Sequence, residues 1–280
     1  MLPPISSWSH SRLGEFEKCK RKIYLMQVEK IPEPERPLPP GKTEHANDRG
    51  SRVHDECEQY IRGTGSLPIE ANKFRVEFEA LRELFVQGKV SLEGEWGMDR
   101  AWNPCAWSGE WTPFDDIGAD FKKLKSLPER GKVGEFIVVD GNGYTWTPPW
   151  LRLKLDALVF DTPTSAIAID YKTGKKFGNE IKHSEQLQLY QLVTFLRYPQ
   201  LETITTELWY LDQDDLTGME VPRLRGLRHK DSWDRRGNKL TTCDEFPPNP
   251  NIHSCKYCPY GPTGTGHCPV GFVTTPFGRR

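Results

Sequence analysis

Residues 151–174 read LRLKLDALVFDTPTSAIAIDYKTG and carry the clearest local pattern of the chain. Apolar residues alternate with other residues along Leu151–Phe160, which is the period of a β-strand. The segment Asp161–Ser165 has the composition of a turn, and Ala166–Lys172 forms a second apolar run. We therefore predict a β-hairpin that is closed by Thr173-Gly174 at its far end.

This hairpin carries charged residues where a charge is costly. Asp170 follows four apolar residues, and Asp156 ends an equally apolar run, so each carboxylate needs a partner. Residues two apart on a strand share a face, which directs Asp170 and Lys172 the same way. With a turn at residues 162–164, Asp156 lies near Asp170 across the ladder. Such a group can bind a hard divalent cation and assist attack of water on a phosphodiester, whereas the alternative is a surface hairpin with solvated charges.

Other elements extend outward from the hairpin in both directions. Before it, helical spacing over residues 9–28, 47–62 and 73–87 predicts three helices, with Ser9 as the N-cap of the first and Gly63 at the end of the second. The prolines of residues 32–40 separate the first two helices as a stiff linker. Residues 90–99 and 135–139 are predicted strands.

Beyond the hairpin, we predict a helix over residues 184–197 and a strand over 203–211. Residues 223–239 are polar and basic. Residues 246–277 are rich in proline, glycine and cysteine, and such a tail needs a staple to hold a structure.

The overall composition is that of a folded protein. Of the 280 residues, 36% are hydrophobic and 28% charged, which fits one large domain or two small ones. Nine Trp, 13 Phe and nine Tyr can bury a sizeable core, which excludes a disordered chain. No apolar run approaches the roughly 20 residues of a membrane-spanning helix. The formal net charge of −1 gives no support to nucleic-acid binding, although charge can be unevenly distributed.

The start of the chain lacks the apolar segment of a secretion signal, so we expect a cytoplasmic protein. In that reducing compartment, clustered cysteines bind metal or react more often than they form disulfides. Cys255 and Cys258 form a C-x-x-C motif, and Cys268 follows after a gap of nine residues. Three thiolates leave a metal site one ligand short, and Cys19, Cys57, Cys105 and Cys243 are the candidates for the fourth.

Three motifs together resemble the PD-(D/E)xK nuclease superfamily, and in particular its RecB-like exonuclease branch. They are Asp156, the run Ile169–Lys175, and a Q-x-x-x-Y motif formed by Gln186 and Tyr190. That branch has an Asp on one strand, a D-x-K on the next and a Q-x-x-x-Y on the following helix. The resemblance implies an α/β fold with a restriction-endonuclease-like core, in which helices flank a mixed central β-sheet, and a cysteine-stapled C-terminal tail.

The resemblance extends to a G-x-x-x-H pattern at Gly50–His54 and to an acidic residue on a preceding strand, for which we choose Glu95, with Glu93 as the alternative on the same face. It implies a site for Mg²⁺ or Mn²⁺ whose ligands are His54, Asp156, Asp170 and the Tyr171 carbonyl, with Glu95 joining through a second ion or water. Lys172 would activate the water or stabilise the transition state. Gln186 and Tyr190 would orient the substrate and the motif.

The first helix adds a further part of the resemblance. Ser9, Cys19 and Tyr24 match the N-terminal signature of RecB-like enzymes that hold an iron–sulfur cluster with one early and three late cysteines. By this resemblance, Cys19, Cys255, Cys258 and Cys268 hold a [4Fe–4S] cluster. A zinc site that uses Cys243, His253 or His267 is one alternative, and no metal is another.

Basic residues supply candidate contacts to DNA phosphates, with a solvated surface as the alternative. We single out Arg21, Lys22, Arg223 and Arg225. Trp residues of the segment between the predicted strands could stack on bases, although a core role is favoured.

Taken together, these features predict a divalent-metal-dependent DNA exonuclease that acts on linear DNA with free ends, in recombination, repair or phage replication, together with a recombination or replication partner protein. For a phage protein the compartment is the bacterial host cytoplasm. A structure-specific endonuclease and a non-catalytic, metal-stapled DNA-binding module are the alternatives. We expect three segments: residues 1–46 with the first helix and linker, a nuclease core over 47–240 with an insertion at about 113–147, and a cysteine-rich tail over 241–280.

Overall fold

The computed structural model of the chain describes residues 4–35, 37–113, 127–131, 135–139 and 142–270. The chain divides into two compact units. Residues 44–230 form one of them, which we call the central unit, and residues 1–43 with 231–280 form the other, which we call the terminal unit.

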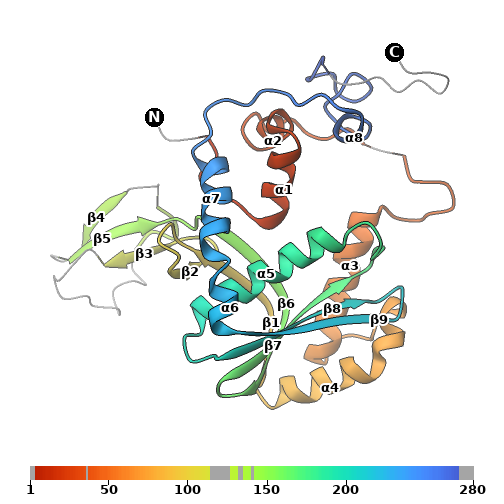
Figure 1. The fold of residues 1–280 in the computed structure, drawn as a ribbon, viewed down its shortest axis with the longest axis vertical. Helices are drawn as coiled ribbons and strands as arrows, with labels where there is room; N and C mark the ends of the chain where they lie inside the picture. Colours follow the sequence, from red (N-terminus) through yellow and green to blue (C-terminus); the bar gives the residue numbers. More distant parts are fainter. Residues whose placement is uncertain (1–3, 36, 114–126, 132–134, 140–141, 271–280) are drawn as a thin grey trace. The chain divides into compact units, whose positions relative to one another are not determined.

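A mixed six-stranded sheet forms the middle of the central unit (Figure 1). Its strands, in their order across the sheet, are β2 (Pro104–Ala106), β1 (Val90–Met98), β6 (Leu151–Thr162), β7 (Ser165–Lys172), β8 (Thr203–Tyr210) and β9 (Asp215–Pro222). All neighbours are antiparallel except β7 and β8, which are parallel. The predicted α/β fold with a mixed sheet flanked by helices is confirmed.

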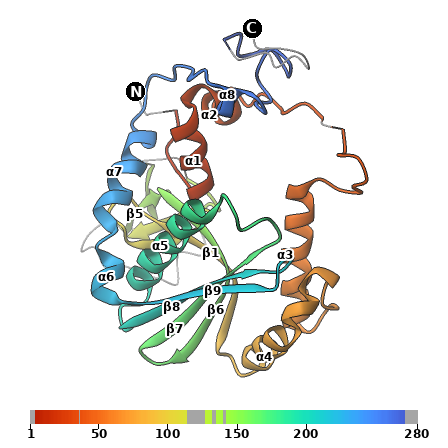
Figure 2. The ribbon, with the colours of Figure 1, turned by 45° about the vertical axis from the view of Figure 1, so that its right-hand side comes forward.

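The hairpin of β6 and β7 lies at the centre of this sheet, as its apolar pattern predicts. Leaving β7, the chain crosses over through α5 (Glu180–Arg197) before it enters β8. A parallel strand pair requires such a crossover, because a tight turn can join only antiparallel strands. Figures 1 and 2 show α5 on the face of the sheet opposite to α4 (Arg75–Val86).

The main core of the central unit lies between the helices α3 (Ala46–Arg62) and α4 and the sheet. It is formed by Val53, Cys57, Tyr60 and Ile61 of α3, Phe78 and Leu81 of α4, and Val90, Ala157, Val159, Ile169, Tyr171 and Trp209 of the strands. Gly63 ends α3 in a left-handed conformation with φ of 79°, as the sequence predicts. The short 3₁₀ helix Ile69–Phe74 precedes α4 and delays its start to Arg75.

A separate three-stranded sheet follows β2 in the sequence, and part of the predicted insertion belongs to it. Its strands are β3 (Glu110–Pro113), β5 (Asn142–Thr147) and β4 (Phe136–Val139), in this order across the sheet. Trp111, Tyr144 and Trp146 form its own small core. Residues 114–126, 132–134 and 140–141 of this segment lie outside the described residues. The Trp111 and Trp146 rings pack edge to face with centroids 5.3 Å apart, so they are core residues.

The terminal unit contains α1 (His10–Lys18), α2 (Lys20–Gln27), nearly all of α7 (Lys230–Thr241) and α8 (Ile252–Cys255), while the five-residue α6 (Arg223–Leu227) belongs to the central unit. The sequence predicts one helix over residues 9–28, but the structure has two. The break falls at Cys19, whose backbone is extended with φ of −160° and ψ of 110°. Ser9 caps α1 as predicted, since its side chain accepts a hydrogen bond from the Arg12 amide.

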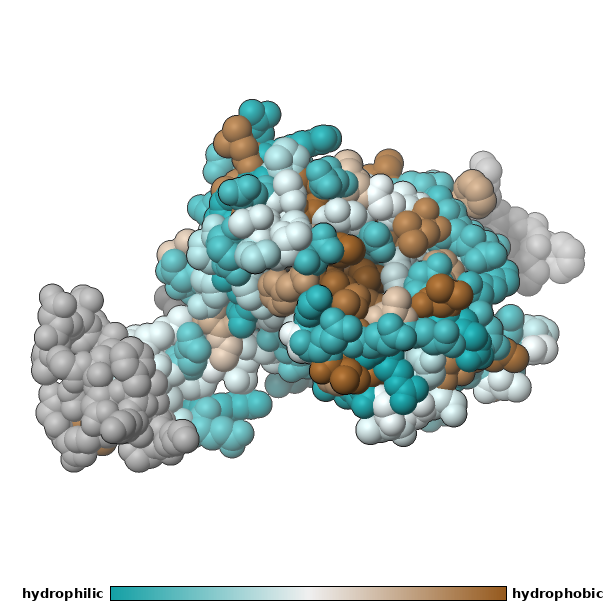
Figure 3. Space-filling view, turned by 90° about the horizontal axis from the view of Figure 1, so that it is seen from below, coloured by the Kyte–Doolittle hydropathy of each residue, from teal (hydrophilic) through white to brown (hydrophobic). Residues whose placement is uncertain are grey.

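The tail after α7 has little regular structure, and hydrogen bonds hold it to other segments of the terminal unit. The Tyr260 hydroxyl donates to the Ile31 carbonyl at 3.1 Å, and the side-chain amide of Asn249 donates to the Lys18 carbonyl at 3.1 Å. Across the part of the chain that the structure describes, every helix is too short or too polar to span a bilayer. The face shown in Figure 3 is mainly hydrophilic, with hydrophobic side chains in separate patches.

Candidate active site

A carboxylate of β6 lies beside a histidine of α3 at one end of the central sheet. The Nδ1 atom of His54 is 2.9 Å from Oδ1 of Asp156. The other oxygen of Asp156, Oδ2, accepts the backbone N–H of Tyr171 at 2.7 Å. This second bond fixes the carboxylate plane and leaves Oδ1 directed at the imidazole.

Glu93 of β1 completes a group of three potential metal ligands. One ligand atom each from His54, Glu93 and Asp156 all lie within 4.8 Å of one another. An imidazole nitrogen and two carboxylate oxygens are a donor set that suits Mn²⁺ and other borderline divalent ions, and the carboxylates suit Mg²⁺. The geometry therefore fits a divalent cation in this group.

Glu95, the acidic residue that we favoured from the sequence, lies apart from this group with an exposed side chain. The register Leu92–Ala157 and Gly94–Leu155 sets Glu93 against Asp156 on the neighbouring strand. Glu93 also has a φ of 47°, which is unusual for a residue with a side chain and interrupts the regular alternation of β1. For this reason Glu93 is directed into the site while Glu95, two residues further, is not.

Asp170 of β7 is the second buried carboxylate of the site, with 3% of its surface exposed. The last residue pair between β6 and β7 is Ala157–Ile169, so Asp156 and Asp170 are the next residues on their strands. Tyr190 and Gln186 of α5 contact Oδ1 of Asp170, the Tyr190 hydroxyl at 2.8 Å and the Gln186 side-chain amide at 3.3 Å. The spacing of four puts both side chains on one face of α5.

Lys172 links these groups. Its ammonium forms an ion pair with Oδ2 of Asp170 and donates to Oε1 of Gln186 at 2.9 Å. The Gln186 amide in turn donates to the Tyr190 hydroxyl at 2.6 Å. The network holds the lysine at the end of β7, beside the carboxylates.

Burial dominates the electrostatics of the carboxylates. It raises the pKa of Asp170, which Asp156 raises further while Lys172 opposes the rise. Burial also raises the pKa of Glu93, against the effect of Lys154. Burial lowers the pKa of His54, but the attraction of Asp156 outweighs it and the pKa lies above its ordinary value. Since a ligand imidazole must be neutral, cation binding displaces a proton from His54 at a pH below this value.

Lysines match the carboxylates of the site. Oε2 of Glu93 is paired with Lys154, and Oδ2 of Asp170 is paired with Lys172. A carboxylate in a buried site is costly unless a cation lies beside it. The imidazole of His54 and the carboxylates of Glu93 and Asp156 form a donor set that fits a divalent metal.

The ring of Tyr171 is buried in the core behind the site. It packs against Phe78 and Trp209, with ring centroids 5.1 and 5.6 Å away, and it lies 5.8 Å from the ring of His54. The backbone N–H of Tyr171 bonds Asp156, and the role of the Tyr171 carbonyl as a metal ligand stays a prediction.

Sequence reasoning missed three residues beside the site. Lys154 precedes Asp156 by two residues, so strand alternation alone could have placed it on the same face. His183 precedes Gln186 by three residues on α5 and contacts the Tyr210 hydroxyl at 2.8 Å, and burial lowers its pKa to about 4. Arg49 binds the Thr173 carbonyl at 2.9 Å and both oxygens of Asp212, which anchors α3, the helix of His54, to the ends of β7 and β8.

The predicted DNA-binding residues have mixed surroundings. In the central unit, Arg223 donates to the Tyr198 and Leu201 carbonyls, while Arg225 is exposed. In the terminal unit, Arg21 lies over the Tyr24 ring, and Lys22 forms an ion pair with Glu15. Arg21 also pairs with Glu29 at 3.9 Å. Arg21, Lys22 and Arg223 thus have partners within the protein, and DNA contacts by these four residues stay predictions.

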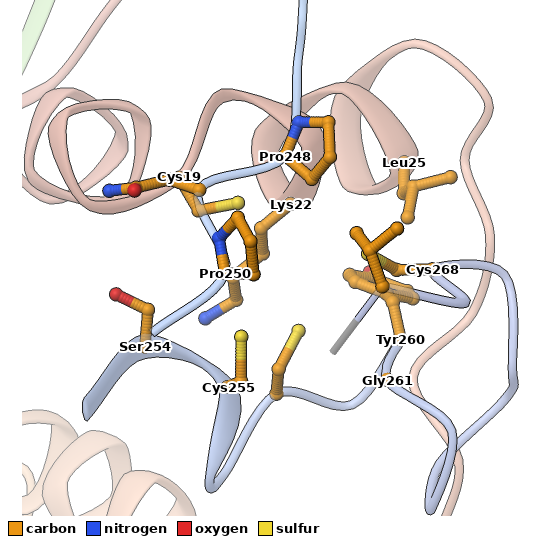
Figure 4. A pocket seen from close by; sticks show the side chains of 13 residues that line it. Cys19, Lys22, Leu25, Pro248, Pro250, Ser254, Cys255, Tyr260, Gly261 and Cys268 are labelled. Atoms are coloured by element: carbon orange, nitrogen blue, oxygen red, sulfur yellow. The ribbon is translucent and has the colours of Figure 1, made fainter. Parts of the chain in front are cut away.

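Four cysteines of the terminal unit line one pocket. They are Cys19, Cys255, Cys258 and Cys268. Figure 4 shows the sulfur atoms of Cys19 and Cys255 directed into the shared space. Burial raises the pKa of the Cys268 thiol, and the other three cysteines add to the rise, which shows that all four are neighbours. The break between α1 and α2 lies at Cys19, one of the four. Cys57, Cys105 and Cys243 are buried elsewhere.

Comparison with known proteins gives one clear family. The model of the PD-(D/E)XK nuclease superfamily matches residues 7–263. None of the curated proteins matches the chain. A solved structure described as "Crystal structure of SSO0001" is 13% identical, with a TM-score of 0.41, over 98% of this chain and 90% of that one. Because the family model covers most of the sequence, the chain belongs to the PD-(D/E)XK nuclease superfamily.

Proposed function

We propose that this protein is a Mg²⁺- or Mn²⁺-dependent exonuclease that hydrolyses phosphodiester bonds of linear DNA. Superfamily membership implies a nuclease that uses a divalent metal and acts on DNA. One observation carries the proposal: two groups of side chains lie side by side. The first is formed by the potential metal ligands His54, Glu93 and Asp156, and the second is the ion pair of Asp170 and Lys172. The Q-x-x-x-Y motif of α5, which resembles that of RecB-like exonucleases, favours cleavage from DNA ends.

Each residue of the site has a defined task in this proposal. His54, Glu93, Asp156 and Asp170 would hold the cation, which supplies Lewis-acid polarisation of the phosphodiester. Lys172 stabilises the negative charge that develops on the phosphate oxygens, because its ammonium is held in place by Asp170 and Gln186. Gln186 and Tyr190 keep the Asp170 carboxylate in one orientation.

The charges of the site match this reaction. Glu93, Asp156 and Asp170 bring three negative charges when ionised, Lys154 and Lys172 bring two positive charges, and a protonated His54 brings a third. Without a cation, the site with ionised acids therefore has no net positive charge to attract a phosphodiester. A divalent ion, held with a neutral His54, would make the site net positive and attract the single negative charge of a phosphodiester.

We also propose that the four pocket cysteines hold a [4Fe–4S] cluster rather than a zinc ion. The four thiols line one pocket, with Cys19 from the break between α1 and α2 and three cysteines from the tail. This arrangement of one early and three late cysteines resembles that of RecB-like enzymes that hold such a cluster. A cluster binds each of four cysteines at a different iron.

The choice between Glu93 and Glu95 gives the first prediction. Glu93→Gln is expected to weaken Mn²⁺ binding by about tenfold or more, because it removes one of the four proposed ligands. Glu95→Gln removes the same charge from the same strand at an exposed position and is the matched control. Isothermal titration of both variants with Mn²⁺ measures the difference. An equal loss of Mn²⁺ affinity in the two variants would show that the affinity depends on the negative charge of β1 and not on direct binding of Mn²⁺ by Glu93.

The function itself is tested on two DNA substrates. End-labelled linear DNA and closed circular single-stranded DNA are incubated with the protein in Mn²⁺ and, separately, in EDTA. We expect degradation of the linear DNA in Mn²⁺, no degradation in EDTA and an intact circle. Cleavage of the circle would indicate an endonuclease. Binding of both substrates without cleavage in Mn²⁺ would indicate a non-catalytic DNA-binding module.

A further inference from the structure

Lys154 reaches into the metal site from the solvent. It lies on β6 two residues before Asp156, and its ammonium forms an ion pair with the Glu93 carboxylate. About 48% of the Lys154 side chain is exposed, against 10% of the Glu93 side chain. Lys154, whose side chain is about half exposed, thus neutralises the largely buried carboxylate of Glu93, a potential metal ligand.

A cation and Lys154 compete for the same carboxylate. Glu93 belongs to the group of three potential ligands, and its buried Oε2 is paired with the ammonium of Lys154. Two positive charges on one carboxylate repel each other strongly when partly buried. A divalent ion at Glu93 must therefore displace the lysine or bind more weakly because of it.

The second lysine of the site differs in this respect. Lys172 is 19% exposed and is held by both Asp170 and Gln186. Asp170 would also hold the cation, but Lys172 keeps Gln186 as a second partner when it does. Lys172 can therefore stay in place when the cation binds, whereas Lys154 loses Glu93, its ion-pair partner, to the cation.

We propose that Lys154 exchanges partners during the working cycle: it is the counter-ion of Glu93 while the site is free of metal, and it binds a DNA phosphate once a divalent cation occupies Glu93. This inference rests on the proposed nuclease function. Lys154 thereby delays tight phosphate binding until the cation is present.

The chemistry of lysine suits this exchange. A flexible four-carbon stem and three donor hydrogens allow the ammonium to move from one oxygen anion to another. The acids that act on Lys154 are Glu93, Asp156 and Asp55. With Glu93 and Asp156 bound to the cation, the remaining anions are Asp55, an incoming phosphate and Glu95, which lies opposite Lys154 in the register of β1 and β6. The phosphate is the partner that the proposal selects, and Asp55 or Glu95 is the competing outcome.

Metal affinity without DNA is the first measurement. Lys154→Met is expected to tighten Mn²⁺ binding about tenfold in isothermal titration, because a competing charge is removed. Lys154→Arg keeps the charge and is expected to bind Mn²⁺ like the wild type. Lys176→Met is a control from outside the ligand group, since Lys176 forms its ion pair with Asp215 instead.

DNA affinity in two conditions is the second measurement. A fluorescently labelled short single-stranded DNA is titrated in Ca²⁺, as an oxygen-binding substitute ion, and in EDTA. In Ca²⁺, Lys154→Met is expected to bind DNA about fivefold more weakly and to lose about one unit of salt slope. In EDTA, it should bind DNA like the wild type, because Lys154 is then engaged by Glu93.

The outcomes separate this inference from the function on which it rests. Unchanged Mn²⁺ affinity in Lys154→Met, or a loss of DNA affinity that is equal in Ca²⁺ and EDTA, would overturn the exchange. Tighter Mn²⁺ binding without any loss of DNA affinity would also overturn it and place the displaced lysine at a neighbouring carboxylate, Asp55 or Glu95. A wild-type protein that binds no Mn²⁺ would refute the proposed function itself. Thermal unfolding checks that Lys154→Met is folded, and Lys154→Gln replaces it if it is not.

Discussion

Lys172→Met is expected to lower kcat about 10³-fold while the affinity for Mn²⁺ changes little. The ammonium is the positive side chain held at the end of β7 by Asp170 and Gln186, where the proposal places the reacting phosphate. Charge that develops on the phosphate oxygens in the transition state then loses its protein partner. Single-turnover cleavage of end-labelled DNA gives the rate, and isothermal titration gives the metal affinity.

The same substitution also leaves the buried Asp170 carboxylate without its ion pair, and a loss of folding must be separated from a loss of chemistry. Thermal unfolding of the variant provides this check, because breaking a buried pair costs about 3–5 kcal/mol. Lys176→Met is the matched control: it also removes a lysine from an ion pair, here with Asp215, in the loop that follows β7. It is expected to retain wild-type kcat.

Two results would contradict the role of Lys172. Cleavage by a folded Lys172→Met at more than about a tenth of the wild-type rate would exclude the loss expected for a transition-state donor. A parallel collapse of Mn²⁺ affinity would instead show that Lys172 acts by orienting Asp170.

The hairpin could be predicted from the sequence because every signal for it is local. Alternation along Leu151–Phe160 and the turn residues after it fix which residues pair. The register then brings Asp156 and Asp170 next to each other, directly beyond the pair Ala157–Ile169, as the turn position implies. The spacing of Gln186 and Tyr190 likewise follows from helix geometry, and both side chains contact Asp170.

The rest of the site depends on features that periodicity does not contain. Alternation gives Glu93 and Glu95 the same face, but a positive φ at Glu93 separates them. Glu93 and Lys154, which form an ion pair, lie 61 residues apart in the sequence, so no local pattern links them. The helical pattern of residues 9–28 also continues through Cys19, where the backbone is extended. Each difference comes from a tertiary arrangement that overrides a local preference.

Cys258→Ser is expected to remove the iron–sulfur cluster and to release the tail that follows α7. The pocket of four cysteines joins Cys19, between α1 and α2, to three cysteines of a segment with little regular structure. Since a metal centre binds only the folded arrangement, its binding free energy counts as folding free energy. Loss of one thiolate therefore lowers the stability of the terminal unit.

The measurement combines metal content with limited proteolysis. Wild-type protein prepared without oxygen is expected to contain about four iron atoms per chain and to absorb visible light. Cys258→Ser should lose both properties and become sensitive to protease in residues 243–270. The central unit has its own core between α3, α4 and the sheet, so its Mn²⁺ affinity should not change.

Cys243→Ser is the matched control for this prediction. Cys243 is a buried cysteine of the same unit, but its thiol contacts the Glu245 carbonyl at 3.0 Å and it does not line the pocket. It is expected to keep the iron and the protease resistance of the tail. If the wild type contains one zinc and no iron, the four cysteines form a zinc site and not a cluster. If Cys258→Ser retains its iron, the metal centre does not use this thiol. Loss of iron from Cys243→Ser alone would move the fourth ligand to the end of α7, outside the pocket, and would refute the arrangement of one early and three late cysteines.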